Sequence, residues 1–257
     1  MKRSVMVGLC VSLLGVSALL YPLLTSGQGQ ADLAPWLMAL LVPLSLLLLA
    51  TELSQHAIDG RSLALLGLLA ACGAALRIPS PGVAGIEPIF FLLVVAGAVF
   101  GSGFGFALGA LTLLVSAFFT GGIGPWLPFQ MLAAAWLGAG AGLFAKFAKT
   151  SRLMLATYTA IACMLYGAVM NLWFWPYGAG STTTLSYLPG GGVSTNLHRF
   201  VIFDLTTSMG FDLPRAFLNA LLISTVGIPL IATLKRFHRR AEFVAPRAVA
   251  GATLLSE

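Results

Sequence analysis

Residues 77–131 determine how the rest of this chain is organised. In order, the stretch contains RIPSPGVAGIEPIFF (residues 77–91), an apolar run, FGSGFGFALG (residues 100–109), a second apolar run and GGIGPWLPFQM (residues 121–131). Two segments rich in glycine and proline, Ile78–Glu87 and Gly121–Phe129, are therefore separated by two apolar runs. If both runs cross a bilayer as a helical hairpin, the two segments emerge on the same side. The stretch predicts one membrane face that carries polar and aromatic loops.

The composition places the chain among polytopic membrane proteins. Of its 257 residues, 58% are hydrophobic and 9% are charged, and the mean hydropathy is +0.95. Soluble domains have about a quarter of their residues charged, so too little polar surface remains here to face water. We therefore expect a multi-pass protein of the plasma membrane. The net charge of +6 comes from basic residues at span ends, which membrane topology and lipid headgroups explain better than a nucleic acid partner.

Eight apolar segments predict an all-α protein with about eight transmembrane helices. They are Val5–Leu24, Pro35–Ala50, Ser62–Leu76, Pro88–Phe100, Gly103–Thr120, Leu127–Ala145, Leu153–Trp175 and Leu213–Thr233. The first segment also has the residue order of a cleaved signal peptide. We expect a retained anchor, because the apolar run is long for a signal peptide and no A-x-A cleavage site follows it.

The distribution of positive charge predicts that both termini are cytoplasmic. The inner side then holds Lys2, Arg3, Arg61, Lys146, Lys149, Arg152, Lys235, Arg236, Arg239, Arg240 and Arg247. The outer side holds Arg77, Arg199 and Arg215, which agrees with the excess of positive charge on cytoplasmic loops. Three segments lie outside in this topology: Arg77–Glu87, Gly121–Phe129 and a long polar loop, Pro176–Asp212.

Sequence motifs for enzymatic chemistry are missing. The chain has no H-E-x-x-H motif, no phosphate-binding G-x-x-x-x-G-K-[ST] and no cysteine pair with metal-ligand spacing, so we expect no catalytic residues, metal site or cofactor. Glu87 and Asp212 fall at span edges. Four charged residues, Arg199, Asp204, Asp212 and Arg215, could form gating ion pairs, but the sequence slightly favours solvated roles for them. The rival interpretation is a membrane enzyme of lipid or isoprenoid metabolism, with Glu87 or Asp204 as its acid or base.

The outer segments favour the binding of an organic molecule. They combine proline-stiffened turns, flat aromatic side chains and neutral hydrogen-bonding groups, which suits a ligand with a large apolar body and several amide or hydroxyl groups. Our candidates for contacting or gating a substrate are Arg77, Glu87, Gly122, Trp126, Phe129, Gln130, Asn171 and Trp175. The alternative for the tryptophans is an aromatic belt at the membrane interface; for Trp126, between two prolines, we favour the site.

The third span is rich in small residues. Ala70 and Ala74, and likewise Ala71 and Ala75, form two A-x-x-x-A spacings that allow helices to approach closely. They could pack against helices of the same chain or against a helix of a partner.

Together these features resemble the substrate-binding S component of energy-coupling factor (ECF) vitamin transporters. The resemblance covers Arg61 to about Arg240, which holds six spans, and RIPSPGVAGIEPIFFLLVVAGAVFG with GGIGPWLPFQM is most similar to the cobalamin-type S components. It divides the chain into an N-terminal transmembrane helix pair (residues 1–60), a six-helix core (61–240) and a cytoplasmic tail (241–257). The N-terminal pair departs from the six-span pattern.

The resemblance implies a function in vitamin uptake. The protein would bind a vitamin, cobalamin or a related corrinoid by preference, at the outer face. Ala70, Ala71, Ala74 and Ala75 would form the face that docks on a transmembrane coupling subunit. Two ATPase subunits would power the complex, and the S component would topple in the membrane to release its substrate inside.

Overall fold

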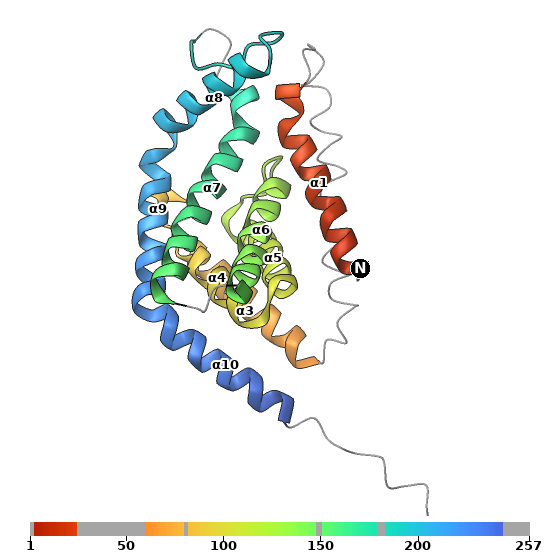
Figure 1. Ribbon diagram of the computed structural model, residues 1–257, viewed down its shortest axis with the longest axis vertical. Coiled ribbons are helices and arrows are strands. Elements are labelled where there is room, and N and C mark those ends of the chain that lie inside the picture. The colour runs from red at the N-terminus through yellow and green to blue at the C-terminus, as the bar shows by residue number, and fades with distance from the viewer. Residues whose placement is uncertain (1–2, 25–59, 80–81, 148–150, 179–182, 244–257) are drawn as a thin grey trace, which may run out of the picture.

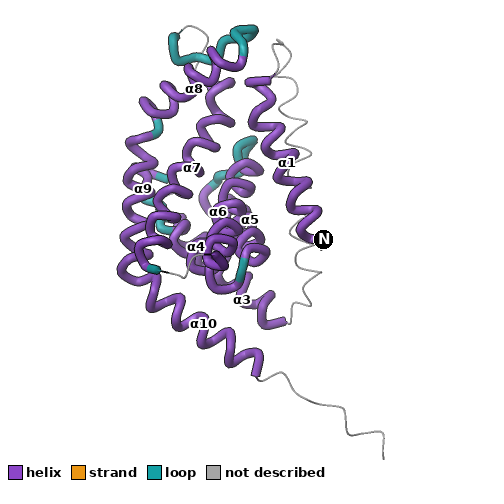
Figure 2. Tube along the Cα trace, in the orientation of Figure 1, coloured by secondary structure: helices purple, strands orange, loops and turns teal. Residues whose placement is uncertain are grey.

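The computed structural model describes residues 3–24, 60–79, 82–147, 151–178 and 183–243. Within these ranges the chain forms helices joined by loops and contains no strand (Figure 2). The expected second span, Pro35–Ala50, and the end of the expected cytoplasmic tail lie outside the described residues.

The helices follow the hydropathy of the sequence closely. They are α1 (Arg3–Leu24), α3 (Gly60–Arg77), α4 (Ile89–Phe100), α5 (Ser102–Thr120), α6 (Leu127–Phe147), α7 (Arg152–Gly178), α8 (Val193–Thr207), α9 (Met209–Leu222) and α10 (Ile228–Phe243). A 3₁₀ turn, η1 (Val83–Gly85), precedes α4, and a π-helical turn, η2 (Ile223–Gly227), joins α9 to α10. The all-α prediction is confirmed for the described residues, because helices occupy seven of the eight expected spans. The last expected span, Leu213–Thr233, is divided between α9, η2 and α10, and α10 continues to Phe243. The number of membrane crossings stays a prediction.

Four helical segments are long and apolar enough to cross a membrane by length and composition. They are Ser102–Thr120, Leu127–Lys146, Arg152–Pro176 and Met209–Arg236. Three further apolar helices are shorter: Gly8–Tyr21, Leu63–Arg77 and Ile89–Phe100. Large side chains such as Leu153, Leu68 and Phe217 are exposed on the outside of the bundle, as expected for a surface that faces lipid.

Helices α4, α5 and α6 form the tightest part of the bundle. A Cβ atom added at Gly97 or Gly105 would collide with the backbone of Gly138, and one added at Gly109 would collide with Ala134. These glycines therefore let the helix backbones touch, which is the common use of small residues between membrane helices. The resulting core buries Ile89 and Phe90 at the start of α4 completely.

The two alanine pairs of α3 face different ways. Ala70 and Ala74 are buried in the bundle, where α3 packs against α5. Ala71 and Ala75 are exposed. One A-x-x-x-A spacing is therefore used inside the chain, and docking of a coupling subunit on the other stays a prediction.

Helix α8 corrects the expectation of a long outer loop at Pro176–Asp212. It lies at one end of the molecule, over the end of α7 (Figure 1). Its sequence is too polar to resemble a span, but Phe203 packs with Trp175 of α7 and Leu23 of α1. Burial of this apolar face against neighbours stabilises a helix that sequence hydropathy does not reveal.

Helix α1 packs along the side of the bundle, on the opposite flank from α9 (Figure 1). Its buried stripe has four-residue spacing and comprises Val11, Gly15, Leu19 and Leu23. Leu19 packs with Phe129 of α6, and Trp173 of α7 packs against this pair. The helix thus braces the outer turns of α6 and α7 from the side.

Candidate functional site

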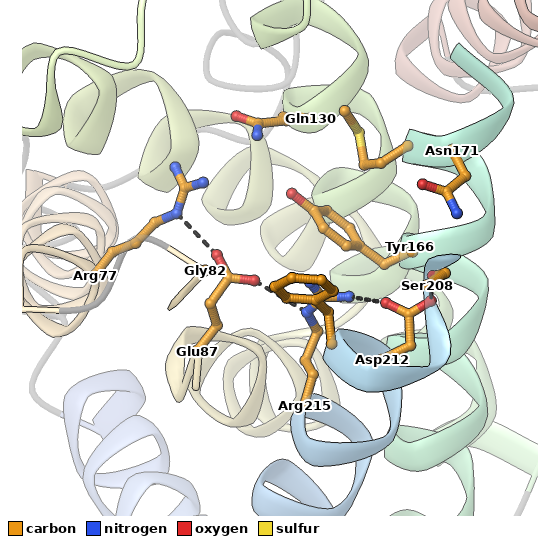
Figure 3. A pocket seen from close by; sticks show the side chains of 12 residues that line it. Arg77, Gly82, Glu87, Gln130, Tyr166, Asn171, Ser208, Asp212 and Arg215 are labelled. Atoms are coloured by element: carbon orange, nitrogen blue, oxygen red, sulfur yellow. Dashed lines mark hydrogen bonds and ion pairs between the residues drawn. The ribbon is translucent and has the colours of Figure 1, made fainter. Parts of the chain in front are cut away.

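A cavity of about 220 Å³ opens between the end of α3, the start of α4 and the helices α6, α7 and α9 (Figure 3). It is lined by Arg77, Gly82, Glu87, Gln130, Tyr166, Gly167, Met170, Asn171, Ser208, Phe211, Asp212 and Arg215. Residues from two of the three expected outer segments, Arg77–Glu87 and Pro176–Asp212, therefore meet at one site, together with Gln130, which directly follows the third.

Four charged side chains form a continuous chain of ion pairs along the cavity. Arg77 Nε lies 3.2 Å from Glu87 Oε1, and Arg215 Nε lies 3.0 Å from Glu87 Oε2. Arg215 Nη1 also pairs with Asp212 Oδ1, and the hydroxyl of Ser208 donates to Asp212 Oδ2. Glu87 is thus shared between two arginines that come from different helices, α3 and α9 (Figure 3).

All four charges are buried, with exposed fractions of 6% for Arg77, 2% for Glu87, 2% for Asp212 and 8% for Arg215. A lone charge buried at such a place costs several kcal/mol even after relaxation, so each member depends on its partners. Two positive and two negative groups also make the cluster neutral as a whole. The expectation that Asp212 and Arg215 are solvated is therefore wrong.

The loop before α4 places Glu87 at the centre of this cluster. Gly85 has a φ of 74°, which favours glycine. A Cβ atom there would also collide with the backbone of Phe211, so the loop lies directly on the start of α9. On the other side, Arg77 ends α3, and its Nη1 donates to Ser116 of α5 at 3.1 Å.

Helix α7 supplies the opposite wall. The Arg215 guanidinium lies 5.4 Å from the centre of the Tyr166 ring, within the range of a cation–π contact. Gly167 leaves room for Asp212, because a Cβ atom at Gly167 would collide with that carboxylate. This wall therefore combines an aromatic face with the space that Asp212 needs.

At the outer end of this wall, the Asn171 amide donates to Asp204 of α8 at 2.8 Å. Burial raises the pKa of the Asp204 carboxyl, and the hydrogen bond from Asn171 acts against that shift. Asn171 thus connects the cavity to α8.

Four of the eight predicted substrate residues line the cavity. Arg77 and Glu87 belong to the ion-pair chain, and Gln130 and Asn171 add neutral amides at its outer side (Figure 3). That they contact a substrate stays a prediction.

The other four predicted residues lie elsewhere. Trp126 is 36% exposed, donates to the Gly122 carbonyl and meets Trp173 edge-on. Phe129 is buried against Leu19 of α1. Trp175 is fully buried and donates to the Leu185 carbonyl at 2.6 Å.

Sequence reasoning did not select the remaining lining residues. They are Gly82, Tyr166, Gly167, Met170, Ser208, Phe211, Asp212 and Arg215. A signal for two of them was present, because Arg215 falls inside an apolar span with Asp212 three residues earlier. Charged residues inside membrane spans mark functional sites by default. Nothing in the sequence pattern singles out Tyr166 or Met170 from the other apolar residues of α7.

The arrangement suits binding better than acid–base catalysis. Both oxygens of Glu87 are paired with arginines, which fixes the carboxylate within the chain of ion pairs. Among the described residues, no group of three His, Cys, Asp or Glu side chains is placed to hold a metal ion. Paired charges, neutral amides and an aromatic ring around one cavity are the features of a small-molecule recognition site.

Comparison with known proteins gives one match. A family model described as the substrate-specific component of ECF transporters matches residues 61–231, well over half of the chain. No curated protein and no solved structure matched. The matched range includes every residue that lines the cavity and begins after α1. The chain therefore belongs to the family of substrate-specific components of ECF transporters.

Proposed function

We propose that the protein captures a vitamin at the cavity around Glu87 and carries it into the cell as the S component of an ATP-driven ECF transporter. The observation that carries this proposal is the buried, lined cavity inside the matched family region. The chain has no phosphate-binding motif of its own. A transmembrane coupling subunit and two ATPase subunits would therefore supply the energy.

A corrinoid such as cobalamin is the substrate that we propose first. The resemblance of residues 77–101 and 121–131 to cobalamin-type S components supports it. The chemistry of the cavity is compatible, because its charges are mutually paired and its neutral polar groups include the amides of Gln130 and Asn171. A corrinoid is rimmed by amide side chains, which would exchange hydrogen bonds with such groups.

The volume of the cavity favours a second candidate. The cavity measures about 220 Å³, which is the volume of about seven water molecules at about 30 Å³ each. Binding sites for drug-sized ligands are larger, at about 300–1,000 Å³. A corrinoid would therefore occupy it only after the walls from α6, α7 and α9 move outward. A small vitamin without net charge would fit the neutral cluster as it stands.

Equilibrium binding separates the two substrates. Purified protein in detergent is titrated with cyanocobalamin and, separately, with a set of small vitamins, and bound ligand is measured after gel filtration. We expect stoichiometric cyanocobalamin binding that Gln130→Ala and Asn171→Ala weaken. Binding of a small vitamin alone would reject the corrinoid and keep the S-component role.

Reconstitution tests the transport role itself. Vesicles that contain this protein, its coupling subunit and both ATPases should transport labelled substrate only when ATP is present on the side of the membrane where the ATPase subunits lie. Accumulation by this protein alone at the same rate would contradict the proposed mechanism.

A further inference from the structure

Asn219 of α9 is a fully buried polar residue next to the cavity but not part of its lining. Its side-chain oxygen accepts a hydrogen bond from the backbone N–H of Phe91 at 2.7 Å. Its side-chain nitrogen donates to the backbone carbonyls of Glu87 at 2.9 Å and of Arg215 at 2.8 Å. The carboxamide therefore links α9 to the start of α4 across 128 residues of sequence.

The bonds to Glu87 and Phe91 replace a helical hydrogen bond. In a regular α-helix the N–H of residue 91 would donate to the carbonyl of residue 87. Here α4 begins only at Ile89, and its N-cap residue Pro88 makes no side-chain capping bond. Because a residue before proline is biased toward extended backbone, Glu87 stays outside the helix. Asn219 inserts between the two groups and satisfies both.

This bridge fixes the backbone on both sides of the central ion pair. Asn219 holds the carbonyl of Glu87 and the carbonyl of Arg215, and the side chains of these two residues meet at 3.0 Å. We propose that Asn219 is a positioning residue of the substrate site, which sets the Glu87 carboxylate between Arg77 and Arg215 without touching the substrate. The role in binding rests on the function proposed above, whereas the bridge itself does not.

Asn196 of α8 provides a matched control. Its side chain is also buried, with an exposed fraction of 2%, and it also bridges backbone groups: it accepts from the N–H of Leu188 and donates to the carbonyl of Leu188, both at 2.9 Å. It stabilises the loop before α8, and neither Asn196 nor Leu188 lines the cavity. Asn196→Ala thus removes the same chemistry at a place remote from Glu87.

The first experiment measures amide exchange of the full chain in detergent, with Asn219→Ser replacing Asn219→Ala if the latter does not fold. Asn219→Ala should speed exchange in a peptide covering residues 82–95 by at least about tenfold, because Phe91 loses its acceptor. Asn196→Ala should change exchange only around residues 183–192. Unchanged exchange at residues 82–95 in the Asn219 variant would overturn the bridge.

The second experiment is a double-mutant cycle with Glu87→Gln, read as melting temperature and as cyanocobalamin affinity. If Asn219 acts by placing the carboxylate, Glu87→Gln should lower the melting temperature less in the Asn219→Ala background than in the wild type. Asn219→Ala should also weaken cyanocobalamin binding at least about tenfold, whereas Asn196→Ala should not.

Additive effects on melting temperature, or unchanged affinity in a protein that binds cyanocobalamin, would reject the positioning role. If the wild type binds no corrinoid, the corrinoid proposal fails. Amide exchange and the double-mutant cycle read as melting temperature then test the role of Asn219 without a ligand.

Discussion

The cavity and the aromatic cluster at the α8 end of the molecule, the end that is expected to lie outside the membrane, are both buried, but different forces stabilise them. At the cavity, Arg77, Glu87, Arg215 and Asp212 form directional ion pairs, so small displacements break specific contacts. At the outer end, Trp175 packs edge-on with Tyr187 and Phe200, and Leu23 and Phe203 complete the cluster. Apolar contacts of this kind tolerate shifts and some changes of shape. A substitution at the cavity should therefore break specific ion pairs, whereas the aromatic cluster at the outer end can adjust its packing.

The largest effect should follow from removing the shared carboxylate. Glu87→Ala leaves Arg77 and Arg215 without their common partner, and breaking a buried pair costs about 3–5 kcal/mol. We expect an unfolding free energy lower by about that amount, measured by denaturant titration in detergent. Glu87→Gln is the matched variant, since it removes the charge and keeps the shape. If Glu87→Ala lowers the unfolding free energy by less than about 1 kcal/mol, which is the range of a solvated ion pair, then water solvates the two arginines and the prediction is contradicted.

A smaller effect is expected from filling the space that Asp212 occupies. In Gly167→Ala the new methyl group collides with the Asp212 carboxylate, so Asp212 must move away from Arg215 and Ser208. Overpacking of this kind costs about 1–3 kcal/mol, and substrate affinity should fall with it. Gly67→Ala is the control, because a Cβ atom at that exposed helical position meets nothing within 4 Å. Equal melting temperatures for the two variants would show that Asp212 is not confined.

At the outer end, Trp175→Phe should have a moderate and local effect. Phenylalanine keeps an aromatic ring, although a smaller one, and loses the hydrogen bond to the Leu185 carbonyl, which costs about 1–2 kcal/mol. Amide exchange should rise near residues 183–200, and substrate affinity should change less than in Gly167→Ala. Affinity lost as strongly as in Gly167→Ala would make the aromatic end part of the binding site.

The smallest effect is expected for Trp126→Ala. The side chain is 36% exposed, and its loss removes an edge contact with Trp173, which is worth about 0.5–1 kcal/mol. We expect a small shift in melting temperature and nearly unchanged binding of a small ligand. A corrinoid that reaches beyond the cavity would contact this rim, so strong loss of cyanocobalamin binding in this variant would extend the site outward.

Most of the fold could be predicted because lipid imposes one rule on sequence. Each crossing segment must be apolar and helical, so spans such as Ser102–Thr120 are visible as composition. Helix α8 could not be predicted in this way, because it is stabilised by contacts within the chain: its Phe203 packs against Trp175 and Leu23. Such packing is a tertiary property and leaves only a weak periodic signal in a polar segment.

The site could be predicted only in part for the same reason. Arg77 and Glu87 are close in sequence and bracket one loop, so their proximity was accessible. Arg215 pairs with Glu87 from 128 residues away, and no local pattern encodes that contact. The tryptophans show a different limit, since aromatic groups near polar segments resemble a binding surface, and their mutual packing, as between Trp126 and Trp173, is not visible in the sequence.

Substrate protection of single cysteines tests the central claim, that the substrate is recognised at this cavity, most directly. In a background with Cys10, Cys72 and Cys163 replaced by alanine, a cysteine is placed at Asn171, which lines the cavity, or at Leu188, which is 41% exposed outside it. Labelling by a water-soluble thiol reagent is then followed with and without cyanocobalamin or the small vitamin that binds. The account predicts that ligand slows labelling at position 171 and leaves position 188 unchanged. Protection at position 188 with unchanged labelling at position 171 would contradict it.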